Sequence, residues 1–255
     1  ILLYNSKTIN KHLGRYRIMN NLDYTSIKEL LSPFAVRQFK LWAMNPDNIH
    51  RGNAVNGVYY ARHRKGRQYN VWWSKVPPEE MWSPIVDILR RYIDVFFQGK
   101  EWDIHVVDTI TTRPNSQKIR AHIDTPYRFE DYAHITNDEV FGVQCIIPLD
   151  PFTIENGATC ILPGSHLSRY YYKDIEENQE EYNDLLTTKG FQFVSSPGDA
   201  LIYNTRTLHS TMPNNSENFR SAILINALDV NLIKRIRELD MNTKTARFDN
   251  KTQKT

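Results

Sequence analysis

Three residues of the chain have the types and the spacing of a metal site. His122 and Asp124 are separated by one residue, and His209 follows far downstream. Two imidazoles and one carboxylate can bind a divalent iron on one face and leave the opposite coordination positions open. The pattern therefore predicts an iron(II) site formed by His122, Asp124 and His209.

The first arginine after the distal histidine stands at a distance that gives it a place in the same site. Arg220 stands eleven positions after His209, at the start of an otherwise apolar segment. Its guanidinium presents a fixed fork of donors that matches a carboxylate. The Pro- and Asn-rich stretch 213–216 predicts a tight reversal between adjacent antiparallel strands. We expect this reversal to bring both side chains into one cavity, where Arg220 would seat an acidic cosubstrate.

The His122-Ile123-Asp124 triplet is a weak signal by itself, because its surroundings also fit a surface strand with a polar face. The segment 118–124 is typical of a short strand that enters a turn. Residues two apart on a strand point to the same face, so His122 and Asp124 would project together. The downstream His209 and Arg220 favour the metal site over the surface strand.

Taken as a set, the motifs of this chain resemble those of the phytanoyl-CoA dioxygenase family. The set comprises His122-x-Asp124, the turn 156–166, the segment Pro197-Gly198-Asp199-Ala200, and His209 with Arg220. The resemblance covers about residues 100–228. Members of this family are iron(II)- and 2-oxoglutarate-dependent oxygenases. The resemblance implies a mainly β fold with flanking α-helices, the double-stranded β-helix or jelly roll that cupins also use.

The resemblance also implies a role for each site residue. Iron(II) would be bound by His122, Asp124 and His209. The cosubstrate 2-oxoglutarate would chelate the iron through its keto acid end and place its far carboxylate on Arg220. Thr211, two positions past the distal histidine, and Thr125, beside Asp124, are further candidates for a hydroxyl contact with that carboxylate.

The implied reaction couples the oxidative decarboxylation of 2-oxoglutarate by O₂ to the hydroxylation of an unactivated C–H bond, with release of succinate and CO₂. Related halogenases replace the iron-binding carboxylate with a small residue. Asp124 keeps that carboxylate, so a hydroxylase is expected rather than a halogenase.

The substrate is less well defined than the metal site. Basic residues near the motifs indicate a small anionic molecule, although a fringe of solvated cations fits the same pattern. Gln144, on the strand predicted over 141–149, has a position from which it can point inward. The candidates for the mouth of the site are Arg113, Lys118, Arg120, Tyr127, Arg128, Gln144, Arg169, Tyr170 and Arg206.

Two functions of other classes fit part of the pattern. A non-catalytic cupin-like protein binds a metal or small ligand, but it has no need of Arg220. A nucleic-acid demethylase of related fold predicts a second arginine soon after Arg220, and residues 221–228 contain none. The balance of 32 basic and 29 acidic residues, a net charge of +3, is too even to predict a nucleic-acid partner.

The remaining sequence predicts a single domain over 1–255. Residues 1–100 would form a helical and hairpin portion with a basic tip at 62–67, 101–230 the catalytic core, and 231–255 a short helix and a frayed tail. Helices are predicted over 24–31, 35–44, 77–98, 174–181 and 231–239. Strands are predicted over 102–111, 118–124, 140–149, 158–162, 190–195, 200–204 and 219–228.

The cysteines, the hydropathy of the chain and His166 allow three further predictions. Cys145 and Cys160 lie in apolar runs and are expected to be buried free thiols, which suits a reducing cytoplasm. No segment has the length and apolar character of a membrane span. His166, at the end of a Pro-Gly-Ser-His turn, is more typical of a structural hydrogen-bonding residue than of a ligand. The sequence leaves open the oligomeric state and whether a leader precedes Ile1.

Overall fold

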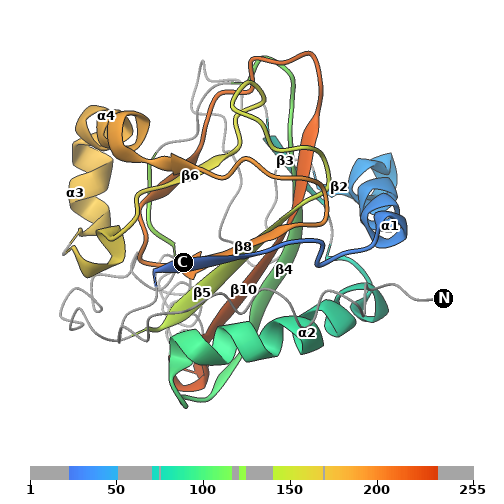
Figure 1. The fold of residues 1–255 in the computed structure, drawn as a ribbon, viewed down its shortest axis with the longest axis horizontal. Helices are drawn as coiled ribbons and strands as arrows, with labels where there is room; N and C mark the ends of the chain where they lie inside the picture. Colours follow the sequence, from blue (N-terminus) through green and yellow to red (C-terminus); the bar gives the residue numbers. More distant parts are fainter. Residues whose placement is uncertain are drawn as a thin grey trace, which may run out of the picture.

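Antiparallel strands build two sheets in the part of the chain that the computed structural model describes, residues 23–50, 71–74, 76–116, 121–124, 140–168 and 170–234. The seven-stranded large sheet has the order β1-β8-β5-β10-β4-β3-β2, and the small sheet has the order β7-β6-β9 (Figure 1). The large sheet consists of β1 (Tyr24–Ile27), β2 (Ile49–His50), β3 (Val71–Ser74), β4 (Trp102–Thr112), β5 (Gly142–Pro148), β8 (Ala200–Asn204) and β10 (Arg220–Asp229). The small sheet consists of β6 (Thr159–Ile161), β7 (Phe191–Gln192) and β9 (His209–Thr211).

The chain alternates between the two sheets, and the space between them is filled with apolar side chains. After β5 in the large sheet come β6 and β7 in the small one, then β8, β9 and β10 in large, small and large. This winding is that of a jelly roll, so the predicted double-stranded β-helix is confirmed. The interior cluster joins residues of both sheets and their connections, namely Ile146, Phe152, Ala158, Ile161, Phe193, Leu201, Tyr203 and Ala222.

Two helices cover the outer face of the large sheet. They are α1 (Pro33–Met44) and α2 (Glu79–Phe97), and α2 runs across β5, β10 and β4 (Figure 1). Successive residues of a strand point to opposite faces, so Ile223 and Ile225 pack under the helices while Ala222 points to the interior. The helix over 35–44 is confirmed and begins at Pro33, with Ser32 accepting a hydrogen bond from the Ala35 backbone N–H at 3.2 Å.

The helix predicted over 77–98 is confirmed as α2. Glu79 and Glu80 occupy its first turn, where acidic side chains complement the helix dipole. Gln98 ends it in the left-handed conformation at φ 50°, and Gly99 follows at φ 88°. Among the described residues, no helix combines the length and the hydrophobicity that a membrane crossing needs. Cys145 and Cys160 are buried free thiols, as predicted.

The helix predicted over 24–31 is wrong, because the segment contains the edge strand β1. Tyr24, Ile27, Leu30 and Leu31 recur at helical steps in the sequence. In the structure, β8 offers an edge, and β1 pairs with it from Tyr24 opposite Tyr203 to Ile27 opposite Ala200. Tertiary pairing therefore overrides the local periodicity.

Other elements differ from the prediction in extent. The acidic segment forms two helices, α3 (Tyr172–Glu177) and α4 (Gln179–Lys189), because Asn178 leaves the helical conformation between them. The strand over 190–195 is reduced to Phe191–Gln192, after which the Ser195 backbone bonds with Phe152 at 2.9 and 3.0 Å. Residues 230–234 are helical. The basic tip at 62–67, residues 117–120 and the tail from 235 lie outside the described residues.

Candidate metal centre

His122, Asp124 and His209 come together in the structure, and their potential ligand atoms all lie within 4.8 Å of one another. The Asp124 carboxylate lies between the two imidazoles. Its Oδ1 is 3.6 Å from His122 Nε2, and its Oδ2 is 3.4 Å from His209 Nε2. The two imidazole centroids are 4.2 Å apart. One atom of each residue can therefore reach a common ion.

Backbone hydrogen bonds hold the two halves of this centre side by side. His122 and His209 form an isolated antiparallel bridge in which each N–H donates to the other's carbonyl at 3.0 Å. The Asp124 N–H donates to the Thr205 carbonyl at 2.8 Å. His122 and Asp124 thus point to the same side, as their spacing predicts, and His209 faces them from β9.

Helix α4 supports the residue that precedes His122. The Ala121 N–H donates to Asn183 Oδ1 at 3.1 Å, and Gln179 Nε2 donates to the Ala121 carbonyl at 3.0 Å. Ala121 and Ile123 are fully buried in a cluster with Ile175 and other side chains of the two helices. Figure 1 shows α3 and α4 on the opposite side of the molecule from α1. The helical insertion therefore positions the histidine.

A backbone carbonyl sets the tautomer of His209. His209 Nδ1 lies 2.9 Å from the Thr207 carbonyl oxygen, which can only accept. Nδ1 therefore carries a proton, and in the neutral imidazole Nε2, which faces the Asp124 carboxylate, keeps the lone pair that a metal needs. This second contact of a histidine to a carbonyl is the usual way in which proteins orient a metal-binding imidazole.

The short contacts of the centre favour a positive charge between its three groups. An imidazole lone pair facing a carboxylate oxygen at 3.4 Å is repulsive unless a proton or a cation lies between them. A shared metal ion satisfies both imidazoles and the carboxylate at once. Two imidazoles with one carboxylate suit non-haem iron(II), so the residues fit the metal that the sequence predicts.

Tyr203 lies beside the centre, and no sequence motif had singled it out. Its ring centroid is 5.0 Å from that of His209, and its side chain is buried. Burial, and then the negative charge of Asp124, raises the pKa of Tyr203 well above its usual value. The phenol therefore stays neutral and packs against the imidazole.

Arg220 is buried, and protein groups accept hydrogen bonds from only some of its N–H groups. Its Nη2 donates to Thr112 Oγ1 at 2.8 Å, its Nη1 donates to the Gly157 carbonyl, and its guanidinium lies 4.8 Å from the Phe152 ring centroid. Burial lowers the pKa of Arg220 to about 10, against the opposing effect of Asp150. The guanidinium stays charged at neutral pH, and an anion placed against it would offset the cost of that burial.

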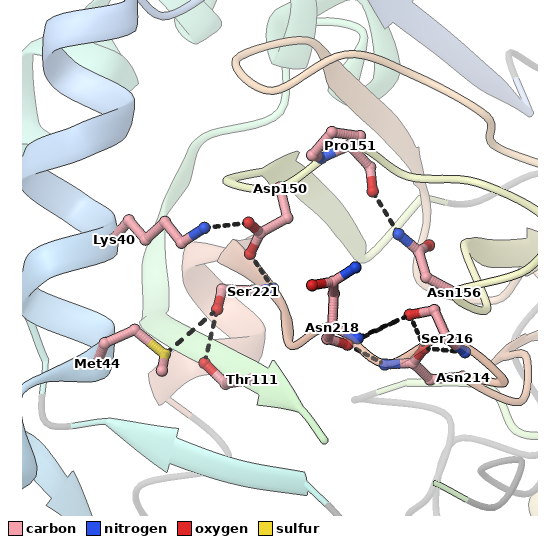
Figure 2. A network of polar contacts seen from close by, with 10 residues as sticks. All are labelled: Lys40, Met44, Thr111, Asp150, Pro151, Asn156, Asn214, Ser216, Asn218 and Ser221. Atoms are coloured by element: carbon pink, nitrogen blue, oxygen red, sulfur yellow. Dashed lines mark hydrogen bonds and ion pairs between the residues drawn. The ribbon is translucent and has the colours of Figure 1, made fainter. Parts of the chain in front are cut away.

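The predicted tight reversal between His209 and Arg220 is wrong. Thr211 pairs with Thr159 in the small sheet, whereas Arg220 pairs with Thr112 in the large one, so the chain crosses between sheets. Asn214 shapes the crossing: its Nδ2 donates to the Arg113 and Asn218 carbonyls at 3.0 and 2.9 Å. Figure 2 shows the part of this network that joins Asn214, Ser216 and Asn218.

The first residues of β10 are anchored by Asp150. Its Oδ2 accepts the Ser221 N–H at 2.9 Å, and its Oδ1 pairs with Lys40 of α1 (Figure 2). The Ser221 hydroxyl also lies 2.9 Å from Thr111 Oγ1. These contacts fix the backbone next to Arg220, so its guanidinium is placed by a rigid strand end.

The other residues singled out from the sequence fall into different places. Thr211 is half-buried in β9, and Thr125 lies outside the described residues. His166 is buried with its Nδ1 2.8 Å from Asp23 Oδ1, apart from the metal centre. Of the proposed mouth residues, Gln144 and Arg206 are buried, Arg113 is exposed and Tyr170 packs on Tyr182 of α4. Lys118, Arg120, Tyr127, Arg128 and Arg169 lie outside the described residues.

Sequence reasoning missed the residues that act through their backbones. The carbonyls of Thr205, Thr207 and Gly157 hold Asp124, His209 and Arg220, but a carbonyl belongs to every residue and leaves no signal in a sequence. Gly157 alone had a recognisable signal, because it lies in the Asn-Gly turn that contributes to the family motif.

A comparison with protein families decides which family the chain belongs to. Residues 27–222 match the family described as phytanoyl-CoA dioxygenase (PhyH). The chain belongs to the phytanoyl-CoA dioxygenase family. The match begins well before residue 100, so the family resemblance extends over α1 and α2 as well.

Individual relatives are distant. A probable alpha-ketoglutarate-dependent hypophosphite dioxygenase of Stutzerimonas stutzeri is 27% identical over 150 residues, which is 55% of this chain and 48% of the relative. A dioxygenase of Talaromyces verruculosus is 27% identical over 128 residues, 50% of this chain and 39% of the relative. The chain thus spans less than half the length of these curated relatives.

Solved structures share the fold at low identity. The HygX protein of Streptomyces hygroscopicus, solved with nickel, 2-oxoglutarate and hygromycin B, aligns with a TM-score of 0.57 and 13% identity over 83% of this chain and 84% of its own. A non-heme alpha ketoglutarate dependent carbocyclase from nogalamycin biosynthesis aligns with a TM-score of 0.55 and 17% identity over 81% and 79%.

Proposed function

We propose that this protein is an iron(II)- and 2-oxoglutarate-dependent dioxygenase that hydroxylates an unactivated C–H bond of a small substrate and releases succinate and CO₂. The observation that carries the proposal is the convergence of His122, Asp124 and His209 within 4.8 Å. Membership of the phytanoyl-CoA dioxygenase family supports it. So do the curated relatives, which are named as dioxygenases.

The residues of the centre would each do one task. His122, Asp124 and His209 would hold iron(II), and the Thr207 carbonyl keeps the Nε2 lone pair of His209 available for it. Bound iron supplies the activation of O₂ at the coordination positions that the protein leaves open. Because Asp124 provides a full carboxylate ligand, the site favours hydroxylation over halide transfer.

Arg220 would bind the far carboxylate of 2-oxoglutarate. A guanidinium has five N–H groups, and the contacts to Thr112 and Gly157 use two of them. Its burial makes an incoming carboxylate a strong partner, because charge-assisted hydrogen bonds gain strength away from water. Thr211, on the strand that carries His209, would add a hydroxyl contact to the same carboxylate, as would Thr125.

An anionic group on the substrate has one supporting residue within the described ranges. Arg206 is 4% exposed and lies between Thr205 and Thr207, whose carbonyls hold Asp124 and His209. A buried cation in that segment suits a substrate with a carboxylate or a similar group.

The test is an anaerobic titration of the iron(II)-loaded protein with 2-oxoglutarate, followed by a weak visible charge-transfer band. We expect a saturable band, and succinate release when O₂ and a substrate are admitted. Arg220→Ala should weaken 2-oxoglutarate binding by about 1.5–3 kcal/mol, the scale of a charge-assisted hydrogen bond, with iron affinity unchanged.

The exposed Arg113→Ala serves as the matched control and should bind 2-oxoglutarate like the wild type. Bound iron without any band would instead favour a non-catalytic cupin-like binding protein. Unchanged 2-oxoglutarate affinity in Arg220→Ala would show that another residue seats the carboxylate.

A further inference from the structure

A row of polar side chains crosses the inner face of the large sheet beside the metal centre. In the strand register, Asn226 of β10 lies opposite Gln144 of β5, and Gln144 lies opposite Tyr203 of β8. Ile146, Leu224 and Tyr203, which have the same parity on their strands, belong to the interior cluster, so this row also faces the interior. Tyr203 packs on the His209 ring, which places the Tyr203 end of the row next to the centre.

The two amides of the row have one consistent orientation. Gln144 Nε2 donates to the Cys145 carbonyl at 3.3 Å, and a carbonyl can only accept. Gln144 Oε1 therefore faces Asn226, whose Nδ2 donates to it at 3.1 Å. Asn226 Oδ1 must then point away from Gln144, as an acceptor.

This acceptor has no protein partner in the described part of the chain. Asn226 is 7% exposed, and its Oδ1 is buried without a hydrogen bond. Buried polar atoms are nearly always paired, and an unpaired one is destabilising by about 1–3 kcal/mol. An unpaired acceptor of this kind, on the sheet face that also carries Tyr203 of the metal centre, indicates a donor that arrives with a ligand.

A second acceptor lies on the neighbouring strand. Asp108 of β4 is opposite Leu224, so it points to the same face as Asn226 and stands one diagonal step from it, a separation of about 7–8 Å. Burial raises the pKa of Asp108 to about 6. Within the described ranges, Asp108 has no ion-pair partner. The inner face thus presents two hydrogen-bond acceptors.

We propose that Asn226, oriented by Gln144, forms with Asp108 a subsite that accepts hydrogen bonds from an N–H or O–H group of the primary substrate. The group that fits is an ammonium or a hydroxyl, because a carboxylate or phosphate would face oxygens of the same polarity. This assignment rests on the proposed dioxygenase function. It adds a donor group to the substrate, at a different place from the anionic group that Arg206 would bind.

The experiment measures the binding of three matched probes, n-butylammonium, 1-butanol and butyrate, by saturation-transfer NMR. The protein carries zinc(II) as a diamagnetic metal and saturating 2-oxoglutarate. We expect n-butylammonium and 1-butanol to bind the wild type through this subsite. Butyrate offers no donor, so its signal should be the same in the wild type and in Asn226→Leu. Asn226→Leu should weaken both donor probes roughly ten-fold or more, the scale of one lost hydrogen bond in a buried site.

Two further variants separate the contribution of the Asp108 charge from a general effect of replacing a buried asparagine. Asp108→Asn should weaken n-butylammonium more than 1-butanol, because only the ammonium gains from the carboxylate charge. Asn48→Leu is the matched control: Asn48 is also buried, and its Nδ2 donates to the Trp42 carbonyl at the end of α1, remote in sequence from the row. It should lose stability and bind all probes like the wild type.

Calorimetric titration with 2-oxoglutarate on the same samples distinguishes failure of the subsite from failure of the proposed dioxygenase function. Intact 2-oxoglutarate binding with unchanged probe binding in Asn226→Leu overturns the subsite and leaves the proposed function standing. A loss of 2-oxoglutarate affinity in Asn226→Leu reassigns Asn226 to the cosubstrate and also overturns the subsite. The subsite is also overturned if the wild type binds only butyrate or binds none of the three probes.

Discussion

Replacing Asp108 with asparagine should stabilise the protein above pH 6 and leave it nearly unchanged at pH 4. Burial raises the pKa of this carboxyl from 3.8 to about 6. The folded state therefore holds the proton more tightly than the unfolded chain, and that advantage is lost as the pH rises from 3.8 through 6. At one pKa unit per 1.36 kcal/mol, the penalty at pH 8 is about 2–3 kcal/mol. Asparagine carries no charge at any pH and avoids it.

Urea denaturation of the metal-free protein at pH 4, 5, 7 and 8 measures this difference directly. The gain in unfolding free energy for Asp108→Asn should grow with pH and level off above about pH 7. Asp103→Asn, an exposed position on the same strand, is the control and should stay within about 0.5 kcal/mol of the wild type throughout. A gain of equal size at pH 4 and pH 8 would refute the electrostatic reasoning, because a packing effect does not titrate.

Two further predictions concern the metal centre and the support of Arg220. His122→Ala and Asp124→Ala should each abolish the rise in melting temperature that iron(II) causes in the wild type, with the metal-free variants folded; a full iron(II) response in both would contradict the assigned ligands. Gly157→Ala should destabilise the protein by about 2 kcal/mol or more and weaken 2-oxoglutarate binding, because Gly157 has φ +74° and an added Cβ would overlap the Met212 carbonyl oxygen. Gly164→Ala, with a similar φ of +82° but open space around it, should show the smaller cost of backbone strain alone and bind 2-oxoglutarate normally.

The features predicted correctly from the sequence are those whose signals lie within a short segment of the chain. The helix α2 has its acidic first turn, its apolar stripe and its terminating glycine within about twenty residues, so its limits were readable. The His122-x-Asp124 spacing implies a shared direction on extended backbone, and the structure shows the two side chains together. Short-range geometry follows from the chain itself, because covalent spacing and dihedral preferences fix it.

The errors came from elements whose form depends on a distant partner. Residues 24–27 become a strand only because β8 presents an edge, and the crossing from β9 to β10 follows from their membership of different sheets. Asp199 is similar: turn chemistry explains its contact with the Ser196 N–H at 3.1 Å, but it also holds the Glu29 N–H at 3.0 Å and Lys28 at 2.8 Å. Those partners lie far away in sequence.

By itself, the sequence determined the residue types of the centre, the fold class and the place of Arg220 after the distal histidine. Only the tertiary structure decided the tautomer of His209, the hydrogen-bond partners of Arg220 and the lack of a partner for the buried Oδ1 of Asn226 among the described residues. The physical reason is that ligand types follow from chemistry carried by single side chains. Hydrogen-bond partners and burial depend on which backbone carbonyls and strand faces the folded chain brings together.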